Sequence, residues 1–291
     1  MIQYTKHRLH GARAQGGFSL IELMISLVIG LVVVGAVFAA YLSTGTSGRN
    51  GRALSQVTED ASIALNVLRT GVAMVGYGAP QDFDKTTGRF VKQYAGVGIF
   101  GCDSAFSDLG KPIDQLTCNA KGDADSVAVA YQADQWNSVT SSNVPLDCLG
   151  GALTAVSGMY LNYSRYYVQD GQLLCRGPAN DAGQALVDNV VDLQIRYGVA
   201  NRVNGTPDSY GAAYYATADE IGAVPNSAGW TNVVAVRICV VVRSAENALN
   251  ESVGTYQGCS GPVEVKDDGD LRMYRAFTTT VVLQNRLGAV L

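Results

Sequence analysis

Histidine is nearly absent from this chain, which has two among 291 residues, His7 and His10, both in the first ten positions. Beyond position 10 the sequence therefore lacks a Ser-His-Asp or Cys-His arrangement, and it lacks the commonest metal ligand. Carboxylate pairs, Ser-Lys pairs and metal-carboxylate sites remain chemically possible, but no motif singles one out. We therefore expect a protein that is not an enzyme, with no catalytic residues, no metal and no cofactor.

Charge is scarce near the start, where the stretch Phe18 to Leu42 contains Glu22 as its single charged residue. As a helix this stretch would be roughly 37 Å long, which exceeds the roughly 30 Å hydrocarbon thickness of a bilayer. We expect it to cross a membrane once. The net charge of −4 does not suit a phosphate-binding surface, so we expect no nucleic-acid partner.

The basic residues at the start predict the orientation of this segment. Lys6, Arg8 and Arg13 precede it without an acidic residue, so the N-terminus is expected in the cytoplasm and the rest outside. Arg49 and Arg52, on the far side, weaken this prediction slightly.

Cysteine is missing from the first 101 residues, and all six cysteines lie on the side expected to be exported. An oxidising compartment would pair them, so we expect three disulfides. Six cysteines permit 15 pairings. The short separations favour Cys102 with Cys118 and Cys239 with Cys259, which leaves Cys148 with Cys175.

The N-terminal segment can be interpreted in two ways. A secretory signal peptide has an apolar core of 7 to 15 residues followed by a cleavage site, and Val37-Phe38-Ala39 could serve as one. Against this, the apolar run is too long and contains an acid, and the small pair Gly16-Gly17 precedes it. Cleavage at that pair would keep the hydrophobic segment.

The motif G-F-S-L-I-E-L, with Gly17, Phe18, Leu20 and Glu22, resembles the processing signal of type IV pilins and type II secretion pseudopilins. The resemblance implies that a prepilin peptidase cuts between Gly17 and Phe18 and methylates the new amino group. Residues 1–17 would be the leader, and the mature chain would have 274 residues and no histidine.

Glu22 then has a predicted role in assembly. A carboxylate in hydrocarbon is costly, at about 2.5 to 3.5 kcal/mol on insertion scales. A free α-amino group is largely cationic near neutral pH, so the amino group of Phe18 in a neighbouring subunit could pair with Glu22 and offset that cost. The alternative is an isolated acid at the membrane edge, satisfied by lipid headgroups.

Helical spacing continues beyond the apolar run. Seven apolar residues recur every three or four positions: Leu54, Val57, Ala61, Leu65, Leu68, Val72 and Val75. We expect one N-terminal helix over 18–79, with 18–42 transmembrane, 53–75 amphipathic, and Gly76 to Pro80 ending it. Glycines at 45, 48 and 51 predict fraying or bending, either as a weak exposed stretch or as a flexible junction.

Residues 80–291 predict a β-rich head. Strands are expected at Ser126 to Tyr131, in a hairpin of Tyr163 to Val168 and Gln172 to Arg176 joined at Asp170-Gly171, and at three later runs. These runs are Leu186 to Tyr197 (a strand or strand pair), Asn232 to Arg243 and Arg275 to Arg286. An antiparallel sheet packed on the helix gives an α+β, type IV pilin-like fold. Residues 81–185 are expected to form a disulfide-braced insertion.

Two acidic clusters could supply oxygen ligands to calcium, but neither has EF-hand spacing. They are Asp123 with Asp125, and Glu264 with Asp267, Asp268 and Asp270. For the second cluster a solvated loop is favoured.

Three late segments, VVDLQIRYGV, WTNVVAVRICVVVRS and YRAFTTTVVLQNR, resemble the PilW group of type IV pilus minor pilins. This resemblance implies a subunit held in the inner membrane with a periplasmic head and then built into the pilus. Its expected partners are other minor pilins, the major pilin, the prepilin peptidase and a large tip adhesin. The implied role is to help initiate pilus assembly in a tip complex, supporting twitching motility and adhesion.

Two other functions remain open from the residues. One is a J-type minor pseudopilin of type II secretion, because the processing signal does not separate the two systems. The other belongs to a different class, a membrane-tethered hydrolase or ligand receptor that uses the cysteine-rich segment.

Overall fold

The computed structural model of the chain describes residues 17–286, except 87–88, 121, 123, 181, 204–205, 208–210, 226 and 268. Residues 1–16 of the expected leader, including both histidines, lie outside the described residues. The chain divides into two compact units, Met1–Arg49 and Asn50–Leu291. The helix α1 (Leu20–Ala73) begins in the first unit and ends in the second.

The first unit contains the apolar part of α1, in which Leu20–Tyr41 is long and apolar enough to cross a membrane and is 0% buried. The glycines at 45, 48 and 51 are helical, so the expected fraying is not observed. The boundary between the two units nevertheless falls within this glycine series, at Arg49 and Asn50.

In the second unit, residues 50–73 of α1 form one wall of the hydrophobic core. Val57, Leu68 and Val72 are fully buried, and the spacing of three to four residues places them on one helix face. The prediction was wrong for Leu54, which is 41% exposed, whereas Ala53 is buried in its place. The helix ends before Gly76, whose φ of 70° reverses the chain direction.

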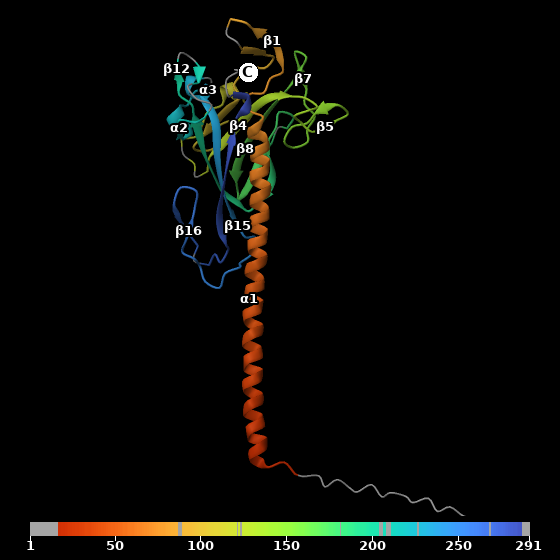
Figure 1. Cartoon of the computed structure of the whole chain (residues 1–291), viewed down its shortest axis with the longest axis vertical. Helices are drawn as coiled ribbons and strands as arrows, with labels where there is room; N and C mark the ends of the chain where they lie inside the picture. Colours follow the sequence, from red (N-terminus) through yellow and green to blue (C-terminus); the bar gives the residue numbers. More distant parts are fainter. Residues whose placement is uncertain are drawn as a thin grey trace, which may run out of the picture. The chain divides into compact units, whose positions relative to one another are not determined.

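The larger sheet is antiparallel, with strand order β10-β9-β8-β4-β3 and β7 paired to β8 (Figure 1). The predicted hairpin of β8 and β9 is present, and Asp170 and Gly171 both have positive φ, as a two-residue turn of this type requires. The bounds are β3 Ile99–Cys102, β4 Ser126–Ala133, β7 Ala155–Val156, β8 Met159–Gln169, β9 Gln172–Arg176 and β10 Gln184–Asp188.

The second sheet is also antiparallel, with strand order β14-β11-β15-β18. Its central strand β15 is the near-continuous apolar run predicted from the sequence. The run predicted at Leu186 to Tyr197 is divided at Asn189, which has a φ of 63°, so β10 and β11 join different sheets. The bounds are β11 Val190–Val199, β14 Tyr214–Ala216, β15 Val233–Arg243 and β18 Tyr274–Val282.

Short elements occupy the connections before and between the strands of the two sheets. The two-stranded ribbons are β1 Pro80–Asp84 with β2 Arg89–Lys92, β5 Thr140–Ser141 with β6 Val144–Pro145, β12 Arg202–Val203 with β13 Thr206–Pro207, and β16 Thr255–Gln257 with β17 Pro262–Glu264. The helical turns are η1 Ile113–Gln115, α2 Ala218–Ile221, α3 Ala228–Thr231 and η2 Gln284–Arg286.

One hydrophobic core unites both sheets with residues 57–75. At its centre Trp230 packs edge-to-face against Phe100 and Tyr197, with ring centroids 5.2 and 4.8 Å away. The Tyr197 hydroxyl lies over Gly101, where a Cβ atom would overlap it. Glycine at this position therefore lets a strand of one sheet approach a strand of the other.

The six cysteines form three disulfides, Cys102–Cys118, Cys148–Cys175 and Cys239–Cys259, which are the pairs that the spacing favours. The first two brace residues 81–185. The expected bracing by disulfides is present, but the segment is not an insertion into the fold, because its strands β3, β4, β8 and β9 build the larger sheet and contribute buried side chains to the core.

Candidate functional site

The processing junction predicted at Gly17 and Phe18 lies in exposed, non-helical backbone directly before α1. Phe18 is 86% exposed, and a Cβ atom at Gly17 would have nothing within 4 Å. Packing within the chain therefore does not require glycine at position 17.

Glu22 lies in the first turn of α1 and contacts its own helix terminus. The Ser19 N–H donates to the Glu22 carboxylate at 3.4 Å, and the Ile21 N–H donates to the Ser19 hydroxyl at 3.2 Å. These reciprocal contacts have the pattern of a capping box, in which the side chains of the first residue and the fourth satisfy free N–H groups. The signal S-x-x-E before an apolar run was present in the sequence, but the sequence analysis did not use it.

Exposed apolar side chains surround Glu22 and continue along the helix to Tyr41. Phe18 and Leu20 are the most exposed large apolar residues of this segment, at 86% and 80%. An exposed apolar surface of this length indicates burial in lipid or against other helices. The carboxylate and this surface together form what we call the assembly segment, residues 17–41.

Comparisons with known families decide between the interpretations of this segment. Residues 12–38 match the prokaryotic N-terminal methylation motif, and residues 165–285 match the family described as Type IV Pilus-assembly protein W. The chain is similar to PilW-type pilins over these residues, and we call it PilW-type on that basis. Its apolar N-terminal helix carries the methylation motif of a membrane-anchored pilin.

The PilW-type pilin is also similar to two solved structures. One is the type IV-like pilin TTHA1219 from Thermus thermophilus, at 14% identity, with 79% of this chain and 98% of that chain covered and a TM-score of 0.38. The other is the GspK-GspI-GspJ complex of the enterotoxigenic Escherichia coli type 2 secretion system, at 11% identity, 78% and 97% coverage and a TM-score of 0.30. A comparison with curated proteins finds no match.

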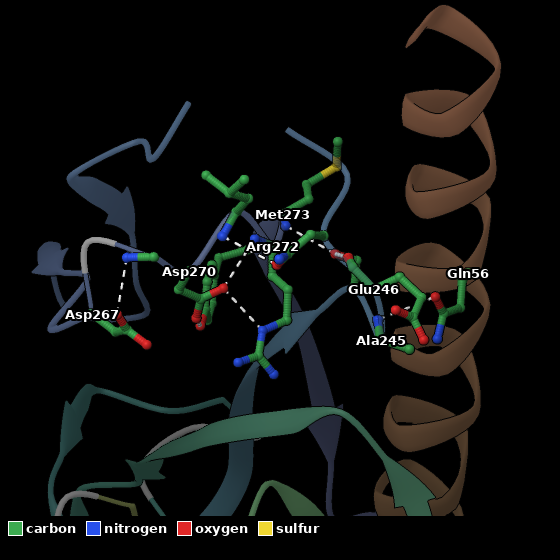
Figure 2. Close-up of polar contacts among 12 residues, drawn as sticks. Gln56, Ala245, Glu246, Asp267, Asp270, Arg272 and Met273 are labelled. Atoms are coloured by element: carbon green, nitrogen blue, oxygen red, sulfur yellow. Dashed lines mark hydrogen bonds and ion pairs between the residues drawn. The ribbon is translucent and has the colours of Figure 1, made fainter. Parts of the chain in front are cut away.

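In the head of this PilW-type pilin, the second acidic cluster forms a hydrogen-bonded loop (Figure 2). The Asp267 carboxylate accepts from the Gly269 N–H at 2.9 Å, and the Asp270 carboxylate pairs with Arg272 at 2.9 Å and accepts from the Tyr274 hydroxyl. Burial raises the pKa of Asp270, but the bonds from Tyr274 and Arg272 outweigh it and lower the pKa overall. Asp267 and Asp270 already have partners within the loop, and Asp270 is buried, so the expectation of a solvated loop was wrong for Asp270.

The same region connects the head to α1. Figure 2 shows Gln56 on the helix facing Ala245, whose N–H donates to the Gln56 side chain at 3.3 Å. Asp123 and Asp268 lie outside the described residues. Among the residues that the structure describes, no group of three or more His, Cys, Asp or Glu side chains could hold a metal ion.

Asp125 is the buried carboxylate of the first acidic cluster, and it connects the two sheets. Its N–H donates to the Leu193 carbonyl at 2.7 Å, and its carboxylate accepts from the Ile195 N–H at 2.6 Å. Burial raises the pKa of Asp125 to about 7. The residue thus binds the start of β4 to β11, a structural role that spacing alone did not reveal.

Proposed function

We propose that this PilW-type pilin is a minor pilin, a structural and non-enzymatic subunit that enters a type IV pilus through its assembly segment. The observation that carries the proposal is the exposed apolar helix with a single carboxylate in its first turn, placed four residues after Phe18. The matches to the methylation motif and the PilW family support it. No catalytic role is needed to explain these features.

Assembly would begin with cleavage between Gly17 and Phe18 and methylation of the new amino group. In the membrane, the Glu22 carboxylate of one subunit would then pair with the N-terminal amino group of its neighbour. Pairing opposite charges in a low-dielectric medium offsets much of the cost of burying each one. The 3.4 Å contact with the Ser19 N–H is long for a hydrogen bond, so the carboxylate can exchange it for a charged partner.

The rest of the proposal follows the family. The subunit would reside in the inner membrane as a single-pass protein with its head in the periplasm, and then pass into the pilus. Three disulfides in the head suit that oxidising compartment. Its partners would be other minor pilins, the major pilin and a tip adhesin, in a complex that initiates assembly and supports twitching motility and adhesion.

A comparison of three variants tests the role of Glu22. Glu22→Gln keeps an oxygen that can accept from the Ser19 N–H but loses the charge, whereas Ser19→Ala keeps the charge and loses one capping contact. If the charge docks the subunit, Glu22→Gln and Glu22→Ala should both lower incorporation into sheared pili by about 10-fold or more, because 1.4 kcal/mol of lost contact corresponds to a factor of ten.

Ser19→Ala should retain most of the incorporation. Equal incorporation of Glu22→Gln and the unaltered chain would show that charge is not used, and an equal loss in Ser19→Ala would assign Glu22 to capping alone. Loss of protein secretion with normal piliation would indicate a pseudopilin instead. In parallel, N-terminal sequencing should find Phe18 first in the unaltered chain and Met1 retained in Gly17→Leu.

A further inference from the structure

A cavity of about 370 Å³ lies in the head between residues 66–71 of α1 and the larger sheet. The loop of residues 137–148 and Leu186 close its sides. Its volume falls within the range of ligand sites, about 300 to 1,000 Å³. The cavity is separate from the assembly segment and has no role in the function proposed above.

The floor of the cavity is built from four buried polar side chains. Tyr131 of β4 lies opposite Asn162 of β8, and Ser164 and Tyr166 follow at alternate positions on the same face of β8. Their exposed fractions are 7%, 3%, 2% and 4%. Strand periodicity would normally direct such a polar row toward solvent, but here it faces the helix.

A hydrogen-bond chain orders this floor. The Ser164 hydroxyl donates to the side-chain oxygen of Asn162 at 2.9 Å, and the side-chain amide of Asn162 donates to the Tyr131 hydroxyl at 2.9 Å. These bonds leave Asn162 with a second N–H and a second lone pair for another partner. Gly71 of α1 leaves room for the Tyr166 hydroxyl, since a Cβ atom there would lie 2.6 Å from it.

The rim carries further neutral groups. Asn66 and Thr70 on α1 are exposed, and Asn137 and Ser138 on the opposite loop are half-buried. The Asp134 carboxylate holds this loop by accepting from the N–H groups of residues 136 and 137 at 2.8 and 3.0 Å.

Trp136, next to the rim residue Asn137, is 86% exposed. Its indole is available to a ligand, because covering it would remove a large apolar surface from water.

The lining carries one charge, and that charge is already hydrogen-bonded. Asp147 is the one carboxylate among the described lining residues, and both of its oxygens are already engaged. One oxygen accepts from the N–H groups of Leu149 and Gly151 at 2.9 and 2.8 Å, and the other accepts from Asn180 at 2.9 Å and Ala179 at 3.3 Å. An anionic ligand would therefore meet a like charge with no cation in the described lining, and a cationic ligand would meet carboxylate oxygens that already accept four hydrogen bonds.

We propose that this cavity binds a neutral saccharide. Hydroxyl groups can both donate and accept, which matches a lining of amides and hydroxyls. The apolar C–H face of a sugar ring suits the exposed indole of Trp136, which precedes the rim residue Asn137 in the chain. A purely apolar ligand would leave Asn162 and Ser164 desolvated without partners, which is costly.

The test uses the full chain in a zwitterionic detergent without a sugar headgroup. Saturation-transfer NMR is recorded with glucose, galactose and N-acetylglucosamine, and N-acetylneuraminate serves as the anionic comparison. At least one neutral sugar should bind in the millimolar range. Thr70→Val and Ser138→Ala should each weaken it about 2- to 10-fold, the effect of one lost hydrogen bond.

Thr58→Val is the matched control. Thr58 donates to the Leu54 carbonyl at 2.8 Å, as Thr70 does to the Asn66 carbonyl, but Thr58 lies outside the cavity. The control should bind the sugar unchanged. Three results would overturn the proposal: no transfer to any neutral sugar, which would indicate a cavity holding water alone; equal effects of the Thr58 and Thr70 changes; or a preference for the anionic sugar.

Discussion

Replacing Asp125 by asparagine should change the stability of the head in a pH-dependent way. The stability of the variant minus that of the unaltered chain should be larger at alkaline pH than at acidic pH. Burial raises the pKa of Asp125 from 3.8 to about 7, and the nearby Asp103 and Asp192 add to the rise. The Ile195 N–H and Arg196 oppose it. The charged form is therefore disfavoured in the fold.

The direction of the pH effect follows from this shift. The folded state binds the Asp125 proton more tightly than the unfolded state, so this contribution to stability is complete below pH 3.8. It is lost as pH rises toward about 7 and changes little above that value. At 1.36 kcal/mol per pH unit, the loss amounts to about 4 kcal/mol at most.

Asparagine removes the ionisation but keeps an oxygen that can accept from the Ile195 N–H. Its amide needs a partner of its own, which could cost about 1 to 3 kcal/mol at every pH. The informative quantity is therefore the change with pH. The stability of Asp125→Asn minus that of the unaltered chain should increase by about 2 to 4 kcal/mol between pH 5 and pH 8.

Urea unfolding of the full, detergent-solubilised chain measures this difference. In a Trp136→Phe background, the buried Trp230 is the remaining tryptophan and reports on the core. Glu59→Gln, which removes an exposed carboxylate from α1, is the control. If the stability difference for Asp125→Asn were the same at both pH values, the reasoning about the buried carboxylate would be refuted.

Two further predictions concern packing of the head and use the same unfolding assay. Leu68→Ala should lower the free energy of unfolding by about 2 to 5 kcal/mol because Leu68 is fully buried. Leu54→Ala, at a 41% exposed site, should lower it much less. Equal losses in the two variants would contradict the described helix face. Gly101→Ala should cost about 1 to 3 kcal/mol by overlap with the Tyr197 hydroxyl, which has no hydrogen-bond partner among the described residues. Tyr197→Phe alone should be close to neutral. Combined with Gly101→Ala it should recover part of the loss, because the ring carbon that carried the hydroxyl would still lie 2.6 Å from the added Cβ atom; strictly additive effects would exclude the contact.

Features that depend on local sequence were predictable. The apolar face of residues 57–75, the turn at Asp170-Gly171 and the long apolar strand β15 all follow from spacing or from turn chemistry. The end of the helix also followed, because Gly76 can adopt a positive φ at no steric cost.

Features that depend on distant pairing were not predictable. A change of direction at Asn189 sends β10 and β11 into different sheets, and local spacing does not specify which neighbour a strand will pair with. Leu54 fits the helical period but lies where no other element of the head covers it well. The polar row Asn162, Ser164 and Tyr166 fits a solvent face, and only the packing of α1 over β8 makes it the floor of a cavity.

For the assembly segment, the sequence indicated the residues, and the structure added a second use for one of them. Glu22 was interpreted as a docking group, with an isolated acid at the membrane edge as the alternative, although Ser19 three positions earlier marks a capping box. The spacing of these two residues contained that information. What one chain cannot contain is the neighbour that would compete for the carboxylate.

The helix α1 contributes buried side chains to the head only beyond residue 50, and this limits how pilins can exchange parts. A hybrid that takes a foreign N-terminal segment up to about Arg49 would leave Val57, Leu68 and Val72 in place, so its head should fold normally. A hybrid joined at Ala73 would replace the residues that fill the interior, and its head would have to accept side chains selected for another protein. The first portion of this helix can therefore be exchanged between pilins without affecting the folding of the head, whereas the second portion must be exchanged together with the sheets that cover it.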